Sequence, residues 1–303
     1  MKTDHIGTEA IDPRYAELDA WSTEDMLAAM YEGQLAAVEA VRPALPALAC
    51  AVEQAAQALA EGGRIVYVGA GTSGRIGVQD GAELVPTFNW AAERLLFLIA
   101  GGTPALTQSI EGAEDSEVDS ARAVAEAKIG VHDVVIGTAA SGTTPYTVAA
   151  LRAAQAAGAV TIGIAGNANA PLLQAVDHPI LVQTGSEVIA GSTRMKAGTA
   201  QKVVLNLFST AVMVKLGRIY RGMMVQMRAT NAKLGRRATA IVSAIAGCPP
   251  DAATRFVEEA SGDVKLAILL ARGLRATDAS RLLGQHNGNL RAAIDALGAN
   301  RHV

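Results

Sequence analysis

The stretch RIVYVGAGTSGRIG, residues 64–77, decides the fold. It opens with a short apolar, β-branched run, and a glycine-rich turn follows at once. Similar runs recur at residues 94–100, 134–138, 160–165 and 179–183. Each run is too short for a helix and lacks in/out alternation, which is typical of strands buried on both faces of a parallel sheet.

Helical patterns fill the gaps between these runs, at residues 75–84, 103–110, 116–127 and 145–157. Alternation of strands and helices predicts a parallel sheet with right-handed crossovers. The five runs therefore predict one α/β domain with a doubly wound, five-stranded parallel sheet.

Helices are predicted on both sides of this region. Ser22 suits the cap of a helix over residues 23–41, and a second helix is expected over 45–60. After residue 191 no strand pattern returns, so residues 193–216 and 221–246 are predicted as helices. A small C-terminal helical bundle is expected from four short segments, residues 251–260, 263–271, 277–283 and 289–297. We place the domain boundary between residues 1–235 and a helical, UBA-like tail of residues 236–303.

Composition narrows the class of protein. Half of the 303 residues are hydrophobic and the net charge is −3 without a Lys/Arg block, which excludes global disorder and argues against nucleic-acid binding. We find no uncharged apolar run of about 20 residues and no leader with an apolar core, so neither a membrane span nor a signal peptide is expected. Cys50 and Cys248 lie far apart, and the five histidines lack metal-ligand spacing. A reduced cytoplasmic protein without a metal is the expectation.

The turn after the first run formally matches G-x-G-x-x-G, from Gly69 to Gly74. The second run, however, ends at Ala100 without the acid that would hold a ribose, so no nicotinamide or flavin cofactor is expected. The turn offers the amide of Gly71 and the hydroxyls of Thr72 and Ser73 at a helix N-terminus, which suits a phosphate.

A second hydroxyl-rich turn follows the third run, with Ser141, Gly142, Thr143 and Thr144 ahead of Pro145. In either turn alone, the hydroxyls are explained as helix caps or turn residues. Two such turns at the binding edge of one sheet predict a phosphomonoester held between them.

Two acids near these turns, Glu83 and Glu114, are candidate proton-transfer groups, and Glu111 is a candidate substrate-binding residue. Glu83 precedes Pro86 at an expected helix end, where the helix dipole disfavours a carboxylate and favours its protonated form. Glu111 and Glu114 follow the second run. Each acid taken singly is also explained as a surface residue.

Together these motifs resemble the N-acetylmuramic acid 6-phosphate etherases of the sugar isomerase (SIS) fold superfamily. The resemblance covers nearly the whole chain, and its most specific block, GSEVIAGSTRMKAGTAQK at residues 185–202, is shared with the glucokinase regulatory protein. The other matching blocks are residues 8–23, 69–83, 99–102, 111–116, 139–146 and 229–234. The sequence departs from the family pattern at Leu84, where cysteine is typical, at Thr143, where arginine is usual, and at Ser186, where alanine or proline is usual. The glutamates are kept, and the fine substrate preference stays open.

The resemblance implies a carbon–oxygen lyase that cleaves the D-lactyl ether of N-acetylmuramic acid 6-phosphate with water. The products are N-acetylglucosamine 6-phosphate and D-lactate, formed by elimination and then hydration. By resemblance, Glu83 is the acid that protonates lactate and then the base that activates water, and Glu114 is the base at carbon 2. The reaction belongs to amino sugar catabolism and cell-wall recycling.

The resemblance also implies a set of binding groups and a homodimer. Ser192 and Thr193 at the start of the long helix would add hydroxyls, and Arg194 and Lys196 would neutralise phosphate or the lactyl carboxylate. A pair of solvated helix charges is the alternative for these two cations. The apolar helix around residues 203–214 is a candidate dimer seam, with intrachain core as its alternative. His286 is a candidate pocket residue from a partner subunit, although a surface position is the simpler interpretation.

Two other classes remain as alternatives. An SIS aldose–ketose isomerase needs only one base and releases no lactate. A non-catalytic sugar-phosphate sensor similar to the glucokinase regulatory protein would carry two SIS domains in about twice this length. The presence of both Glu83 and Glu114 favours the etherase.

Overall fold

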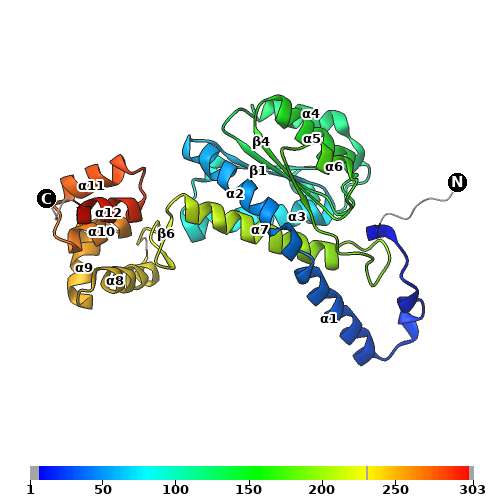
Figure 1. Cartoon of the computed structure of the whole chain (residues 1–303), viewed down its shortest axis with the longest axis horizontal. Helices are drawn as coiled ribbons and strands as arrows, with labels where there is room; N and C mark the ends of the chain where they lie inside the picture. The colour runs from blue at the N-terminus through cyan, green and yellow to red at the C-terminus, as the bar shows by residue number, and fades with distance from the viewer. Residues whose placement is uncertain (1–6, 230, 300–303) are drawn as a thin grey trace. The chain divides into compact units, whose positions relative to one another are not determined.

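The computed structural model describes residues 7–229 and 231–299. Five parallel strands form one sheet in the order β2-β1-β3-β4-β5, which confirms the predicted architecture (Figure 1). The strands are β1 (Ile65–Gly69), β2 (Leu95–Ile99), β3 (Val134–Thr138), β4 (Val160–Ala165) and β5 (His178–Leu181).

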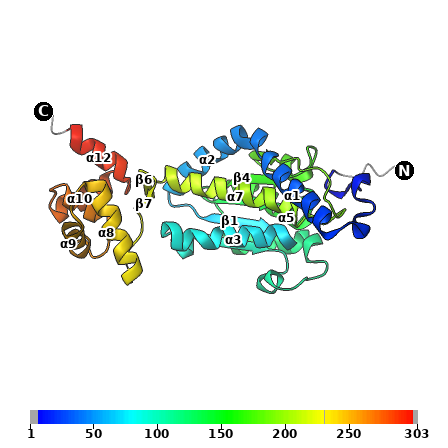
Figure 2. The ribbon, with the colours of Figure 1, turned by 90° about the horizontal axis from the view of Figure 1, so that it is seen from below.

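Helices cover both faces of this sheet. One face is covered by α4 (Glu117–Glu126), α5 (Pro145–Ala156) and α6 (Pro171–Gln174). The other face carries α2 (Leu45–Ala60), α3 (Gly71–Phe88) and α7 (Lys196–Lys215), with α1 (Thr23–Glu39) beyond them (Figure 2). Ser22 caps α1 as expected, because its hydroxyl accepts the amide of Asp25.

Close packing of α3 on β1 explains the glycines of the first turn. A Cβ on Gly69 would lie 2.9 Å from the Cα of Gly74, so a side chain here would push the helix off the strand. A buried polar contact holds the same pair of elements: the hydroxyl of Tyr67 donates to Asp80 at 2.7 Å, and Asn206 on α7 donates to the same carboxylate. Burial, together with the Asp80 carboxylate, raises the pKa of Tyr67 well above its usual value. The N-terminus of α3 is thus fixed at the end of β1.

An ion pair joins the starts of β1 and β3. The guanidinium of Arg64 donates to Asp133 at 2.6 Å and 3.0 Å, and the carboxylate also accepts the backbone amides of Arg64 and Gly130. The side chain of Asp133 is only 8% exposed. Burial opposes its ionisation, but these hydrogen bonds outweigh burial and lower the pKa of Asp133.

The chain divides into two compact units. One holds Met1–Glu83 and Ala91–Thr210, and the other holds Leu84–Trp90 and Ala211–Val303. The second unit contains a hairpin of β6 (Ile219–Tyr220) and β7 (Met223–Met224) and the helices α8 (Ala232–Ala246), α9 (Pro250–Glu259), α10 (Val264–Ala271), α11 (Ala276–Gln285) and α12 (Leu290–Ala299). The predicted small C-terminal helical bundle is confirmed.

The two compact units divide between Thr210 and Ala211, well before the expected boundary between residues 235 and 236. The physical reason is that Tyr220, Val225 and Met227 are buried in the same apolar cluster as Ile241 and Val242 of α8. The boundary as a division between catalytic domain and tail stays a prediction.

The structure corrects several expectations for secondary structure. Strands do return after residue 191, in the β6–β7 hairpin, whose two-residue strands are too short to show a period. The same hairpin takes the place of the first part of the helix expected over residues 221–246. Residues 103–110 contain only the 3-10 turn Thr103–Leu106, which follows two glycines with positive φ, Gly101 and Gly102.

One stretch, Thr23–Ala60, is apolar and long enough to cross a membrane if length and composition alone are considered. The expectation concerned uncharged runs, and this stretch carries charged residues, among them Glu32, Glu39 and Glu53. The α2 part of the stretch buries Leu48, Val52 and Leu59 and packs on β3, β4 and β5, as a core helix does.

Candidate functional site

A pocket of about 450 Å³ lies beyond the carboxyl ends of β1 and β2. It is lined by the first turn of α3 (Gly71, Thr72, Arg75) and by the connection from β2 to α4, which includes Glu111 and Glu114. Ligands of open parallel sheets bind at this edge. The structure therefore brings the predicted phosphate turn and two of the predicted acids into one pocket.

The two hydroxyl-rich turns are neighbours. The register pairs Gly69 of β1 with Thr138 of β3, so both strands end at the same level. The first turn presents the amides of Gly71 and Thr72 at the start of an 18-residue helix. Ser73 is buried beneath them. An anion at this point faces the positive end of the helix dipole.

The turn after β3 is built around Gly142. This residue has a φ of +75°, and a Cβ there would lie 2.4 Å from the Cβ of Ala170, so only glycine fits. The hydroxyls of Ser141 and Thr143 bond to each other at 2.8 Å, and Thr143 is exposed. Thr144 is the N-cap residue of α5, yet within the described chain its side chain makes no capping bond. The capping explanation is therefore weakened for Thr144, whereas Ser141 acts as a turn residue, since its hydroxyl accepts the backbone amide of Thr143 at 3.3 Å.

Glu114 sits in a 3-10 turn, Ala113–Asp115, that follows Gly112 in the left-handed conformation. Glu111 and Glu114 are both exposed to solvent at the pocket. The connection that carries them is tied to α3 by Arg75, whose Nε donates to the carbonyl of Ala105 at 3.0 Å and whose Nη2 donates to that of Gln108 at 2.9 Å. Sequence reasoning treated Arg75 only as part of a motif and missed this contact.

The signature block 185–202 forms the loop ahead of α7. The helix begins at Lys196, so Ser192, Thr193 and Arg194 precede it rather than opening it, which corrects the expected start. Buried Glu187 provides the cap, since its carboxylate accepts the amides of Lys196 and Ala197 at 2.9 Å each.

This first turn of α7 adjoins the phosphate turn, because a Cβ on Gly198 would lie 3.6 Å from Cγ2 of Thr72. The amine of Lys196 donates to the carbonyl of Ser186 at 2.8 Å, and Arg194 is exposed. Neither cation lines the pocket of Glu111 and Glu114. Their roles toward the substrate stay predictions.

An N-terminal segment that sequence reasoning left without a role braces the second turn. The amide nitrogen of Asn167 donates to the carbonyl of Ser141 at 2.9 Å and to the hydroxyl of Thr8 at 3.3 Å, and Thr8 is 1% exposed. Ser186, one of the departures from the family pattern, donates its hydroxyl to Asp12 at 3.2 Å. Hydrogen bonds from Arg14 hold the pKa of Asp12 well below its usual range.

Glu83 does not join the pocket. It is exposed on α3, twelve residues after Gly71, which is about 18 Å along the helix axis and beyond the reach of a glutamate side chain. The expected helix end is also wrong: α3 continues through Pro86 to Phe88. The argument that the helix dipole favours a protonated Glu83 is weakened, since that effect is confined to the last turn.

The remaining candidates lie away from the pocket. His286 ends α11 in the second compact unit and is half-buried there. The expected dimer seam around residues 203–214 is mostly intrachain core, because Val204, Leu205, Phe208 and Val212 are buried. Only Leu207 and Val214 are exposed among the large apolar residues of this stretch. Across the described ranges, no three His, Cys, Asp or Glu side chains gather as metal ligands would.

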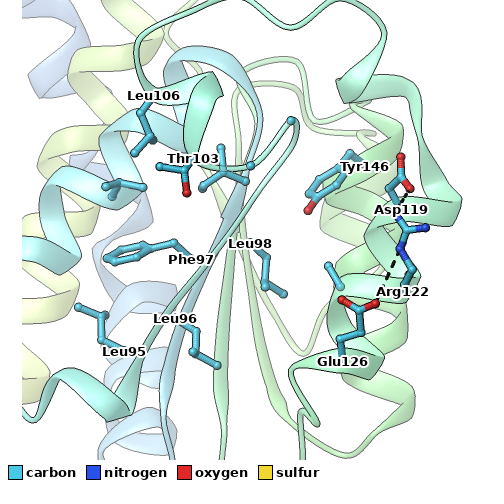
Figure 3. A pocket seen from close by; sticks show the side chains of 15 residues that line it. Leu95, Leu96, Phe97, Leu98, Thr103, Leu106, Asp119, Arg122, Glu126 and Tyr146 are labelled. Atoms are coloured by element: carbon cyan, nitrogen blue, oxygen red, sulfur yellow. Dashed lines mark hydrogen bonds and ion pairs between the residues drawn. The ribbon is translucent and has the colours of Figure 1, made fainter.

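A second cavity of about 570 Å³ runs along the edge strand β2 (Figure 3). Apolar side chains of β2 form its floor, and Asp119, Arg122 and Glu126 of α4 stand at its rim. Arg122 pairs with Asp119 at 2.5 Å and lies 3.9 Å from Glu126. Burial, with Asp119 nearby, raises the pKa of Tyr146 in its wall. This cavity lies beside the sheet rather than at the carboxyl ends of its strands, and its cation Arg122 is already paired with Asp119. It therefore fits a sugar phosphate less well than the smaller pocket does.

Comparisons with known proteins show the family of the chain. The family described as the glucokinase regulatory protein N-terminal SIS domain matches residues 47–155. The N-acetylmuramic acid 6-phosphate etherase of Deinococcus radiodurans is 49% identical, over 98% of this chain and 99% of that protein. The enzyme of the same name from Cutibacterium acnes is 45% identical, over 95% of each chain. Among solved structures, a phosphoheptose isomerase from Francisella tularensis is 17% identical, with a TM-score of 0.48 over 64% of this chain and 100% of that chain. Identities of 49% and 45% over nearly the full length show that the chain belongs to the N-acetylmuramic acid 6-phosphate etherase family.

Proposed function

We propose that this chain cleaves the D-lactyl ether of N-acetylmuramic acid 6-phosphate with water, giving N-acetylglucosamine 6-phosphate and D-lactate. The observation that carries the proposal is one pocket that combines the phosphate turn of α3 with the acids of the β2–α4 connection. The reaction serves amino sugar catabolism and cell-wall recycling. We place it in the cytoplasm, where the free thiols of Cys50 and Cys248 stay reduced.

Ether bonds resist direct hydrolysis because an alkoxide is a poor leaving group. In the open-chain sugar the aldehyde acidifies the proton on carbon 2. A base removes this proton, a double bond forms between carbons 2 and 3, and the bond from carbon 3 to the lactyl oxygen breaks. Water then adds its oxygen to carbon 3, and a proton returns to carbon 2. The route needs one base and one acid, which two carboxyl groups supply.

Glu114 is the base at carbon 2 in this proposal, because it lines the same pocket as the phosphate turn. Glu83 protonates the departing lactate and then activates water. Since Glu83 is about 18 Å along α3 from its own phosphate turn, it reaches a substrate only in the pocket of a second subunit. The proposal therefore requires a homodimer in which each site combines Glu114 of one subunit with Glu83 of the partner subunit.

An exposed apolar stripe on α1 supports this dimer. Leu27, Tyr31, Leu35 and Val38 follow one another at spacings of four, four and three residues, and they are 60%, 65%, 54% and 48% exposed. The opposite face of α1, with Gly33 and Ala37, is buried. A stripe of this length facing water marks a protein interface. We assign it to the twofold contact and add exposed Leu207 of α7 to the same seam.

The reaction itself is tested by incubating the protein with N-acetylmuramic acid 6-phosphate in water enriched in oxygen-18. We expect D-lactate without label and N-acetylglucosamine 6-phosphate with one labelled oxygen, at carbon 3. Label in lactate would mean displacement at the lactyl carbon. Binding without lactate release would favour the sensor. In a parallel incubation, conversion of an aldose phosphate with a hydroxyl on carbon 2, such as glucose 6-phosphate, to its ketose would favour the isomerase.

The shared site is tested by mixing two inactive variants, Glu83→Gln and Glu114→Gln. After free subunit exchange, half of the dimers are mixed, and each mixed dimer has one site with both glutamates intact. We therefore expect about one quarter of wild-type activity to return. Each variant incubated alone is the control. If both glutamates came from one chain, no mixed dimer would hold a complete site and activity would not return.

A further inference from the structure

Arg75 is the one positively charged side chain among the described residues that line the pocket of Glu111 and Glu114. Its Nε and Nη2 are fixed by the carbonyls of Ala105 and Gln108. Its Nη1 has no hydrogen-bond partner in the described part of the protein, and the side chain is half-buried. The guanidinium is thus held rigidly at the pocket with donors to spare.

The proposed substrate carries two anions, a phosphate on carbon 6 and the carboxylate of the lactyl group on carbon 3. In the proposed site, the amides at the N-terminus of α3 and the turn hydroxyls donate hydrogen bonds to the phosphate. A lactyl carboxylate that enters beside Glu111 and Glu114 meets two like charges. It needs a cation to offset them, and a planar guanidinium matches a carboxylate in geometry as well as charge.

The order of the strands places that cation at the right end of the sugar. In the open-chain sugar, carbons 4 and 5 separate carbon 3 from carbon 6, so the lactyl carboxylate and the phosphate occupy different positions along the substrate. The phosphate turns follow β1 and β3, whereas the connection that Arg75 contacts follows β2, on the other side of β1. Neighbouring strands are about 4.8 Å apart, so the β3 turn and the β2 connection are separated by about 10 Å. A sugar whose phosphate lies between β1 and β3 extends its carbon 3 substituent toward Arg75.

We propose that Arg75 binds the lactyl carboxylate and makes the enzyme selective for ethers that carry this negative charge. The inference rests on the proposed etherase function and adds a specificity-determining residue to it. The amine of Lys196, a candidate of the signature block for the lactyl carboxylate, donates to the carbonyl of Ser186, and Lys196 does not line this pocket.

The test compares N-acetylmuramic acid 6-phosphate with its carboxamide, in which the lactyl carboxylate is a neutral lactamide. Wild-type protein is expected to prefer the acid by about 10- to 100-fold in kcat/KM, the value of a charge-assisted pair. Arg75→Met, which keeps the apolar stem, should cleave both compounds at equal kcat/KM. Arg75→Lys keeps the positive charge but loses the paired hydrogen bonds to the carbonyls of Ala105 and Gln108. It should retain a preference for the acid.

Two results would overturn the proposal. If Arg75→Met lowers kcat/KM equally for both compounds, Arg75 only braces the β2–α4 connection or binds the phosphate. If the wild type cleaves both compounds equally well, the enzyme does not recognise the charge of the lactyl group. Should Arg75→Met be inactive, binding of the two compounds is measured in a Glu114→Gln background, with and without Arg75→Met, where the difference in Kd should vanish with the arginine. Failure of the etherase function itself is distinct, since wild-type protein would then cleave neither compound.

Discussion

Replacing Glu114 by glutamine is expected to lower kcat for lactate release by about 10²- to 10⁴-fold, the usual contribution of a general base. Glutamine keeps the shape and exposure of the side chain in the 3-10 turn but cannot accept the proton from carbon 2. The measurement is D-lactate release from N-acetylmuramic acid 6-phosphate. Glu117→Gln is the matched control: it removes an exposed carboxylate three residues away that does not line the pocket, and activity should not change.

Exchange of the carbon 2 proton with deuterium oxide separates the two glutamates. If Glu114 is the base, Glu114→Gln abolishes both exchange and lactate release. Glu83→Gln should leave exchange intact while lactate release fails, because the proton is removed but the leaving group is not protonated. Exchange that survives in Glu114→Gln and disappears in Glu83→Gln would reverse the two roles. If both variants keep proton exchange and lactate release, neither glutamate takes part in the mechanism.

The buried parts of the sheet were the easiest to predict from the sequence. The runs 134–138 and 160–165 coincide with β3 and β4, because strands covered on both faces are apolar throughout and end at glycine-rich turns. The two-residue strands of the β6–β7 hairpin have no such signal, since a period needs more residues than they contain. Tertiary packing with α8–α12, rather than local pattern, positions that hairpin.

The placement of the two hydroxyl-rich turns at one edge was predictable for the same reason. Parallel strands end at one edge of a sheet, and the adjacency of β1 and β3 makes the turns at Gly71 and Ser141 neighbours. Glu111 and Glu114 join them because they follow the adjacent strand β2. The hold of Arg75 on two carbonyls was not predictable, since it depends on how the irregular connection after β2 folds back on α3.

The position of Glu83 relative to the site could not be predicted from the sequence. The proline three residues later suggested a helix end, but α3 continues past it for two residues, and Glu83 stays far from the phosphate turn of its own chain. Proline costs the helix one backbone hydrogen bond, and a position this close to the last turn tolerates the loss. In the proposed mechanism this acid therefore acts from a partner subunit.

The ion pair between Arg64 and Asp133 is expected to have the largest effect on stability of the pairs described here. Asp133→Ala leaves a guanidinium that is 27% exposed without its carboxylate, and it removes the acceptor for two backbone amides. We expect the free energy of opening the sheet to fall by about 3 kcal/mol, the low end for a broken buried pair, because Arg64 is partly solvated. Hydrogen-exchange mass spectrometry on peptides that cover β1 and β3 measures this for the first compact unit alone. The control is Glu39→Ala, which breaks an exposed pair with Arg42 and should leave exchange in these peptides unchanged.

The same pair gives the sheet a pH dependence with a defined sign. The pKa of Asp133 is lower in the folded protein than the value of about 3.9 in an unfolded chain, so its contribution is complete above that value. As the pH falls below about 4, the unfolded chain takes up the proton first and the contribution declines until the folded carboxyl is protonated as well. Wild-type protein should therefore lose protection in β1 and β3 more steeply below pH 4 than Asp133→Asn, which has no carboxylate to titrate and keeps the side-chain volume. Parallel acid profiles in the two proteins would mean that other carboxyl groups govern the acid sensitivity of the sheet, and that the hydrogen bonds around Asp133 add no linkage of their own.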